Sequence, residues 1–100
     1  MYYELSVVDC KEENYKGLID SLNENGIQCK LNNNQGKNMF DQQFVNAVLS
    51  FSSDIASNVL ADLILIGLGK AYTMYINGRK VKADSSENVK KVIDDINEEL

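Results

Sequence analysis

The chain opens with a strict alternation of hydrophobic and polar residues. Every second position is hydrophobic at Tyr3, Leu5 and Val7. A period of two predicts a β-strand with one buried face. The pattern returns after residue 26 and predicts a second strand, whose hydrophobic positions are Ile27, Cys29 and Leu31.

Between these strands the hydrophobic spacing is that of a helix. Hydrophobic residues recur three or four positions apart, at Tyr15, Leu18, Ile19 and Leu22, and so share one helical face. Asp9 and Glu12 have the spacing of a capping box at its start. The Asn25-Gly26 pair supplies a residue for the left-handed conformation at its end. We expect a helix over residues 11–25, and a right-handed crossover that leaves the two strands parallel.

The middle of the chain shows neither strand alternation nor proline. Residues 40–69 carry Ala, Leu, Ser and Asn at helical spacings, which predicts one long helix or two helices in series. A break near Ser50–Ser53 would provide a serine cap for a second helix that begins at Asp54. Two glycines are expected to end it, Gly67 and Gly69.

The most hydrophobic run of the chain, Leu63–Gly69, is too short to span a membrane. It has seven uncharged residues after Asp62, whereas a spanning helix needs about 20. We expect a buried helix that covers the sheet. Its hydrophobic side chains point in nearly every direction, so part of it should stay exposed. Leu65 and Leu68 are the candidates for a self- or partner-interface.

The segment after this helix predicts a β-hairpin. Asn77-Gly78 separates residues 72–76 from residues 79–83, and this dipeptide favours a turn that needs positive φ at both central positions. A two-residue turn places Tyr75 opposite Lys80 and Thr73 opposite Lys82. The core side of the hairpin is then formed by Tyr72, Met74, Val81 and Ala83.

The C-terminal residues predict a closing helix. Asp84 and Glu87 again have capping-box spacing, and a hydrophobic stripe follows at Val89, Val92, Ile93, Ile96 and Leu100. The predicted order is β-α-β-α(α)-β-β-α in a single α+β domain over residues 1–100. We expect a two-layer sandwich with a four-stranded mixed sheet and helices on one face. The alternating strands leave the other face open, with Glu4, Ser6, Lys30, Thr73, Tyr75, Lys80 and Lys82 on it.

The charge of the chain and its cysteine content indicate which partners and which cellular compartment to expect. The net charge is −5, from 10 basic and 15 acidic residues, and an acidic domain repels the nucleic-acid backbone. Two cysteines are too few for a disulfide framework, and the first residues lack the basic start of a secretory signal. We therefore expect a cytoplasmic protein that begins at Met1 and binds neither nucleic acid nor membrane.

The residues of common catalytic sites are missing. The sequence has no histidine, which removes the usual general base, the histidine-dependent nucleophiles and most transition-metal sites. Cys10 and Cys29 lack an activating neighbour and are expected to be inert. The Gly67–Lys70 segment lacks the first glycine and the Ser or Thr of a phosphate-binding loop. We expect no enzymatic activity, cofactor or metal.

Two groups of polar residues are candidate contact surfaces. Asp54, Asn58 and Asp62 lie four residues apart, a stripe that could hold a cation or a basic partner group or could simply be a solvated helix face. The Tyr75, Lys80 and Lys82 spot on the open sheet face is either cross-strand stabilisation or a docking spot.

The order of elements resembles a bacterial family. A polar glycine-containing loop leads into a Ser/Ala/Leu-rich helix, then a hairpin with the sequence TMYINGRKVKAD and a closing helix. This layout, most specifically Ala61–Lys70 followed by Tyr72–Asp84, resembles the effector-associated constant component domains of bacterial conflict systems. The resemblance implies a non-enzymatic adaptor beside effector or NTPase components. The chain departs from the family in having only Lys70 where an Arg-rich stretch is often found.

We therefore expect a protein–protein interaction module of a bacterial defence system, with an effector, ATPase or nuclease as partner and a homodimer as one further possibility. The alternative is a phage- or plasmid-encoded inhibitor or immunity protein, similar to an anti-CRISPR, that blocks a nuclease. Acidic clusters can imitate nucleic-acid phosphates, and the last helix ends in such a cluster, Asp94, Asp95, Glu98 and Glu99.

Overall fold

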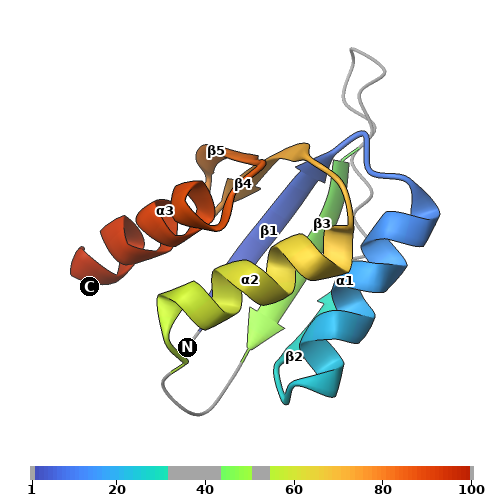
Figure 1. The fold of residues 1–100 in the computed structure, drawn as a ribbon, viewed down its shortest axis with the longest axis horizontal. Helices are drawn as coiled ribbons and strands as arrows, with labels where there is room; N and C mark the ends of the chain where they lie inside the picture. The colour runs from blue at the N-terminus through green and yellow to red at the C-terminus, as the bar shows by residue number, and fades with distance from the viewer. Residues whose placement is uncertain (1, 32–43, 51–54, 100) are drawn as a thin grey trace.

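The computed structural model describes residues 2–31, 44–50 and 55–99, which form an α+β fold (Figure 1). The elements are β1 (Tyr2–Val8), α1 (Glu12–Glu24), β2 (Gln28–Leu31), β3 (Phe44–Ser50), α2 (Ser57–Leu68), β4 (Tyr72–Ile76), β5 (Arg79–Ala83) and α3 (Ser86–Glu98). The helix and strands expected near the N-terminus, the hairpin and the closing helix are all present. None of the described helices is long and apolar enough to cross a membrane.

The five strands form one sheet in the order β2-β3-β1-β4-β5, and every neighbouring pair is antiparallel. The expected four-stranded mixed sheet is wrong because residues 44–50 form a strand instead of a helix. β3 lies between β1 and β2, so these two run in the same direction but do not pair. Up to β4 the chain thus has the split β-α-β arrangement of ferredoxin-like folds, to which β5 and α3 are added.

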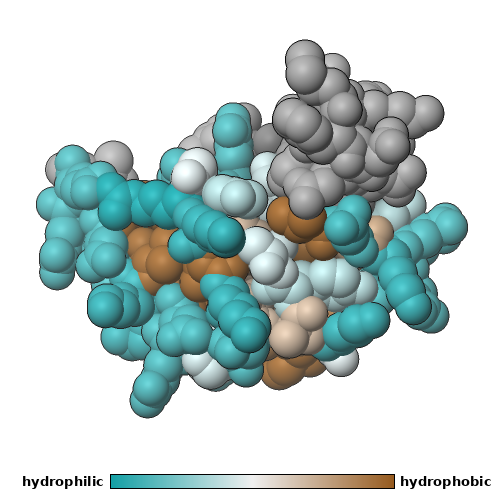
Figure 2. All heavy atoms as spheres, turned by 90° about the horizontal axis from the view of Figure 1, so that it is seen from above, coloured by the Kyte–Doolittle hydropathy of each residue, from teal (hydrophilic) through white to brown (hydrophobic). Residues whose placement is uncertain are grey.

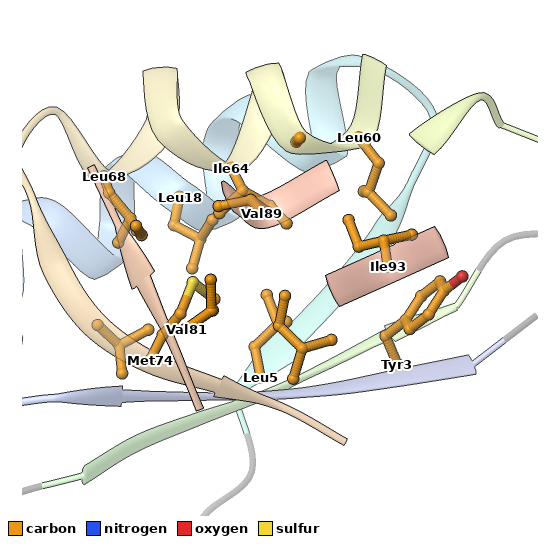
Figure 3. Packing of buried hydrophobic residues seen from close by; sticks show 14 of the residues in the cluster. Tyr3, Leu5, Leu18, Leu60, Ile64, Leu68, Met74, Val81, Val89 and Ile93 are labelled. Carbon is orange, nitrogen blue, oxygen red and sulfur yellow. The ribbon is translucent and has the colours of Figure 1, made fainter. Parts of the chain in front are cut away.

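The described helices α1, α2 and α3 lie on one face of the sheet, as expected (Figure 1). α2 is the middle helix of this layer and contacts both α1 and α3. Seen from close by, helices and sheet enclose a hydrophobic core (Figure 3). The sheet side of this core includes Leu5, Met74 and Val81, and the helix side includes Leu18, Leu60, Ile64, Leu68, Val89 and Ile93.

The hairpin has the predicted register. Tyr75 pairs with Lys80 and Thr73 with Lys82, and the four residues expected on the core side are buried: Tyr72, Met74, Val81 and Ala83. Local turn chemistry therefore determines which side chains of β4 and β5 reach the open face.

Both expected capping boxes are wrong. Lys11, not Asp9, is the N-cap of α1, and it makes no side-chain cap hydrogen bond. Asp9 instead takes a positive φ of 51° in the turn after β1, a conformation that Asp tolerates better than most residues. At α3 the cap is Ser85, whose side chain accepts a hydrogen bond from the Asn88 amide.

The ends of α2 agree with the sequence in part. Gly69 takes the left-handed conformation, with φ of 68°, and ends the helix as expected. Gly67 lies inside the helix. α2 begins at Ser57 after Ala56, and the expected break at Ser50–Ser53 and helix start at Asp54 fall largely on residues 51–54, outside the described residues.

Candidate interaction surface

One face of the sheet carries none of the described helices. The side chains that alternate with the core residues of β1, β2, β4 and β5 are exposed or half-buried, as expected for Glu4, Ser6, Lys30, Thr73, Tyr75, Lys80 and Lys82. The single glutamate and three lysines of this set make the face basic, although the whole chain has a net charge of −5. We call these seven residues the open face.

The centre of this surface is the half-buried Tyr75 on β4. The backbone pairing places Ser6 of β1 on one side of Tyr75 and Lys80 of β5 on the other. Thr73 and Lys82 form the neighbouring pair. A tyrosine with two lysines on the neighbouring strand suits a ligand that combines apolar groups with negative charge.

A reciprocal pair of hydrogen bonds holds the hairpin turn against β1. The Glu4 amide donates to Asn77 Oδ1 at 2.8 Å, and the Asn77 amide donates to the Glu4 carbonyl at 2.9 Å. Asn77 also has the positive φ, 49°, that the turn requires. The turn is therefore fixed to the central strand of the sheet, which places Tyr75 and Lys80 in a defined position.

The two leucines proposed as an interface are not both on the surface. Leu68 is completely buried, because it points from α2 toward the sheet (Figure 3), and that part of the prediction is wrong. Leu65 is half-buried and packs against the core. The exposed hydrophobic side chains of α2 are Ile66, with 72% of its surface accessible, and Val59, with 45%. In the view of Figure 2, hydrophobic residues reach the described surface only in separate patches among hydrophilic ones.

The polar stripe of α2 has a structural contact at one of its positions. Ser86, the first residue of α3, donates a hydrogen bond to Asp62. Asn58 is exposed, and Asp54 lies outside the described residues. The described residues contain no group of three or more cysteines and carboxylates that could hold a metal ion.

A hollow of about 500 Å³ lies on the first turns of α1. Its described lining consists of two lysines and two glutamates, Lys11, Glu12, Glu13 and Lys16. Glu12 and Lys16 form an exposed ion pair at 3.1 Å. The opposite charges offset one another, so this lining does not favour an ion of either sign.

Both cysteines are free thiols buried in the core cluster. Burial raises the pKa of the Cys29 thiol to about 11. Burial also raises the pKa of Cys10, although a hydrogen bond with Tyr72 opposes this effect. Thiolates are the reactive form of cysteine, so neither side chain is suited to nucleophilic chemistry at neutral pH.

Several polar contacts between distant residues have no signal in the sequence. The Tyr72 hydroxyl donates to Asn14 Oδ1 at 2.7 Å, and Asn14 Nδ2 donates to the Leu68 carbonyl at 2.6 Å. The Tyr3 hydroxyl donates to Asn97 Oδ1 at 2.6 Å. These bonds satisfy polar groups at the margin of the core and join β4 to α1 and β1 to α3. These hydrogen bonds have a structural role. Among the described surfaces, the open face is therefore the best candidate for binding a ligand.

Comparison of the chain with models of protein families, with curated proteins and with solved structures found no match.

Proposed function

We propose that this domain is a non-enzymatic adaptor that binds another protein on the open face of its sheet, within a bacterial conflict system. The observation that carries the proposal is the basic and aromatic surface around Tyr75, Lys80 and Lys82, on a sheet face without a described helix. A fold of this kind hosts many functions, so the argument rests on this surface and not on the architecture.

The chemistry of the chain supports a binding role. The sequence has no histidine, and burial raises the pKa of both thiols. Binding, in contrast, needs only a fixed surface with a suitable mixture of apolar and charged groups. The hairpin is such a surface, because Asn77 ties it to β1. The resemblance of the helix–hairpin–helix segment to effector-associated constant component domains supports an effector or an ATPase as the partner.

Site-specific photo-cross-linking tests this proposal. A photo-reactive amino acid replaces Thr73 on the open face or, as the matched control, Ile66 on the outer side of α2. Both positions tolerate a bulky group because Thr73 is half-buried beside solvent and Ile66 is exposed. The variants are expressed together with the genes that neighbour their own gene in its genome, whatever proteins these encode.

We expect a covalent protein adduct from position 73 and none from position 66. Adducts from position 66 alone would overturn the proposal, and adducts with a nuclease from that position would favour the acidic inhibitor instead. Adducts of position 73 with single-stranded nucleic acid would also overturn it, since an aromatic sheet face can stack bases.

A further inference from the structure

Strand β5 forms one edge of the sheet. Among the described strands it pairs only with β4. The helix side of β5 is closed, because Val81 and Ala83 are buried and α3 contacts the strand. Among the described residues, both the outer edge of β5 and its open-face side chains are therefore accessible to a binding partner.

The hairpin geometry determines which backbone groups lie on that edge. In a hairpin with a two-residue turn, the flanking residues Ile76 and Arg79 exchange backbone hydrogen bonds, and bonded and non-bonded pairs then alternate. Lys80 and Lys82 occupy the non-bonded pairs. Their N–H and C=O groups therefore point away from β4, toward the open edge.

The same two residues place positive charge on the open face. Both lysines are exposed, and residues two apart along a strand are about 7 Å apart on one face. Arg79 is on the other side of the strand, where it forms an ion pair with Glu99, the C-cap residue of α3. The basic side chains of β5 on the open face are thus Lys80 and Lys82. Lysines on an edge strand discourage pairing with strands of similar charge, but they favour an acidic strand.

We propose that β5 receives an extended acidic segment of the partner protein as a sixth, antiparallel strand. Residues directly opposite Lys80 and Lys82 in such a strand are two positions apart and have their side chains on the open face. The recognised pattern is then acid-x-acid, with the middle side chain on the helix side beside Val81. This inference rests on the proposed function, since it specifies how the adaptor's partner binds.

Labelled synthetic peptides test the pattern. The probe is a short threonine-rich peptide with a central Glu-Val-Glu. The control peptide has the same composition with a central Glu-Glu-Val, which places one acid on the wrong side of the strand. We expect the control to bind at least about threefold more weakly. The Lys80→Glu/Lys82→Glu variant should bind the probe about tenfold more weakly than the natural protein, because two attractive cross-strand pairs become repulsive.

Lys30→Glu provides the control for net charge. Lys30 is an exposed lysine of the open face on β2, at the opposite edge of the sheet, so its reversal should change affinity less than about twofold. Amide hydrogen exchange gives an independent result. The N–H groups of Lys80 and Lys82 should exchange more slowly with the probe bound, because they become hydrogen-bonded to it.

Equal binding of both peptides, or binding without slower exchange at Lys80 and Lys82, would overturn strand addition. Absence of probe binding would overturn it as well. If position 73 nevertheless cross-links to a partner protein, the adaptor proposal stands and only the binding mode is wrong. If cross-linking also fails, both are wrong.

Discussion

Gly17 of α1 and Gly67 of α2 meet backbone to backbone where the two helices cross. A Cβ atom added to Gly67 would lie 2.6 Å from Leu18 Cα and 2.9 Å from the Gly17 carbonyl oxygen. Nearby, Ser21 Oγ donates a hydrogen bond to the Leu63 carbonyl at 2.9 Å. The close approach of the two backbones thus allows a side chain of α1 to form a hydrogen bond with the backbone of α2.

Replacing Gly67 with alanine should therefore destabilise the protein. Alanine gains about 1 kcal/mol of helix propensity over glycine, but its methyl group would meet backbone atoms that cannot move independently. We expect a net loss of about 1–2 kcal/mol, measured by urea denaturation. Asn58→Ala, on an exposed position of the same helix, should be neutral or slightly stabilising. Equal effects of the two substitutions would contradict the close packing.

A charge should destabilise the protein strongly on the buried side of α2 and very little on its exposed side. Leu68→Asp places a carboxylate in the completely buried core and should cost about 4 kcal/mol or more, close to the whole stability of many small domains. Ile66→Asp changes a side chain with 72% of its surface exposed and should leave the thermal transition within a few degrees of the natural protein. Circular dichroism during heating measures both, and loss of the fold in the Ile66 variant would contradict the orientation of α2.

Removal of the Asn14 side chain should lower the stability of the protein, because this side chain forms hydrogen bonds with both Tyr72 and the end of α2. Asn14→Ala removes the acceptor of the Tyr72 hydroxyl proton and the side-chain donor to the Leu68 carbonyl, and should cost about 1–3 kcal/mol. A double-mutant cycle with Tyr72→Phe isolates the direct bond. We expect a coupling of about 1 kcal/mol by urea denaturation, whereas additive effects would show that the bond contributes little.

Stability should depend on Asp94 at acid pH. The pKa of Asp94 is lowered by the hydrogen bond from Lys90, at 2.8 Å, and by another from Ser57 at the start of α2. A carboxyl whose pKa is lower in the folded state stabilises the fold above its unfolded pKa, about 3.9, and loses this effect as pH falls through the folded pKa. Asp94→Asn should thus be less stable than the natural protein at pH 6, and the difference should shrink below about pH 4. A difference that stays constant down to pH 2 would exclude this role.

Cys29 should make stability fall in alkaline solution. Its folded pKa of about 11 lies above the value of an ordinary thiol, about 8.5. The unfolded chain therefore loses this proton first, and stability should decrease as pH rises from about 9 to 11. Cys29→Ala lacks this contribution, so its denaturation midpoint should show a smaller decrease over that range. If the denaturation midpoints of the two proteins fell equally with pH, the raised pKa of Cys29 would be contradicted.

The parts of the fold that sequence alone predicts are those determined by neighbouring residues. The Asn77-Gly78 turn carries its own conformational preference, so the register of Tyr75 with Lys80 and the composition of the open face around it follow from local chemistry. The stripe of α3 is similarly local, and Val89, Ile93 and Ile96 are buried as expected.

Residues 44–50 show why the sheet could not be predicted in full. Their Ala, Leu, Ser and Asn content is compatible with a helix, and strand propensity depends strongly on the surroundings. Their conformation is decided by pairing with β1 on one side and β2 on the other. The sequence predicts a helix end at Gly67, which lies inside α2, for a related reason. Its neighbour is Gly17, on another helix, and hydrophobic spacing within one segment contains no information about such a crossing.

The central position of β1 has a consequence for synthesis of the protein. Its partners β3 and β4 begin at Phe44 and Tyr72, so a ribosome must deliver most of the chain before the first strand has neighbours on both sides. Until then Leu5 and Val7 stay without their native surroundings in the nascent polypeptide, a situation in which chaperones commonly engage. Productive folding is therefore expected to follow release of the last third of the chain.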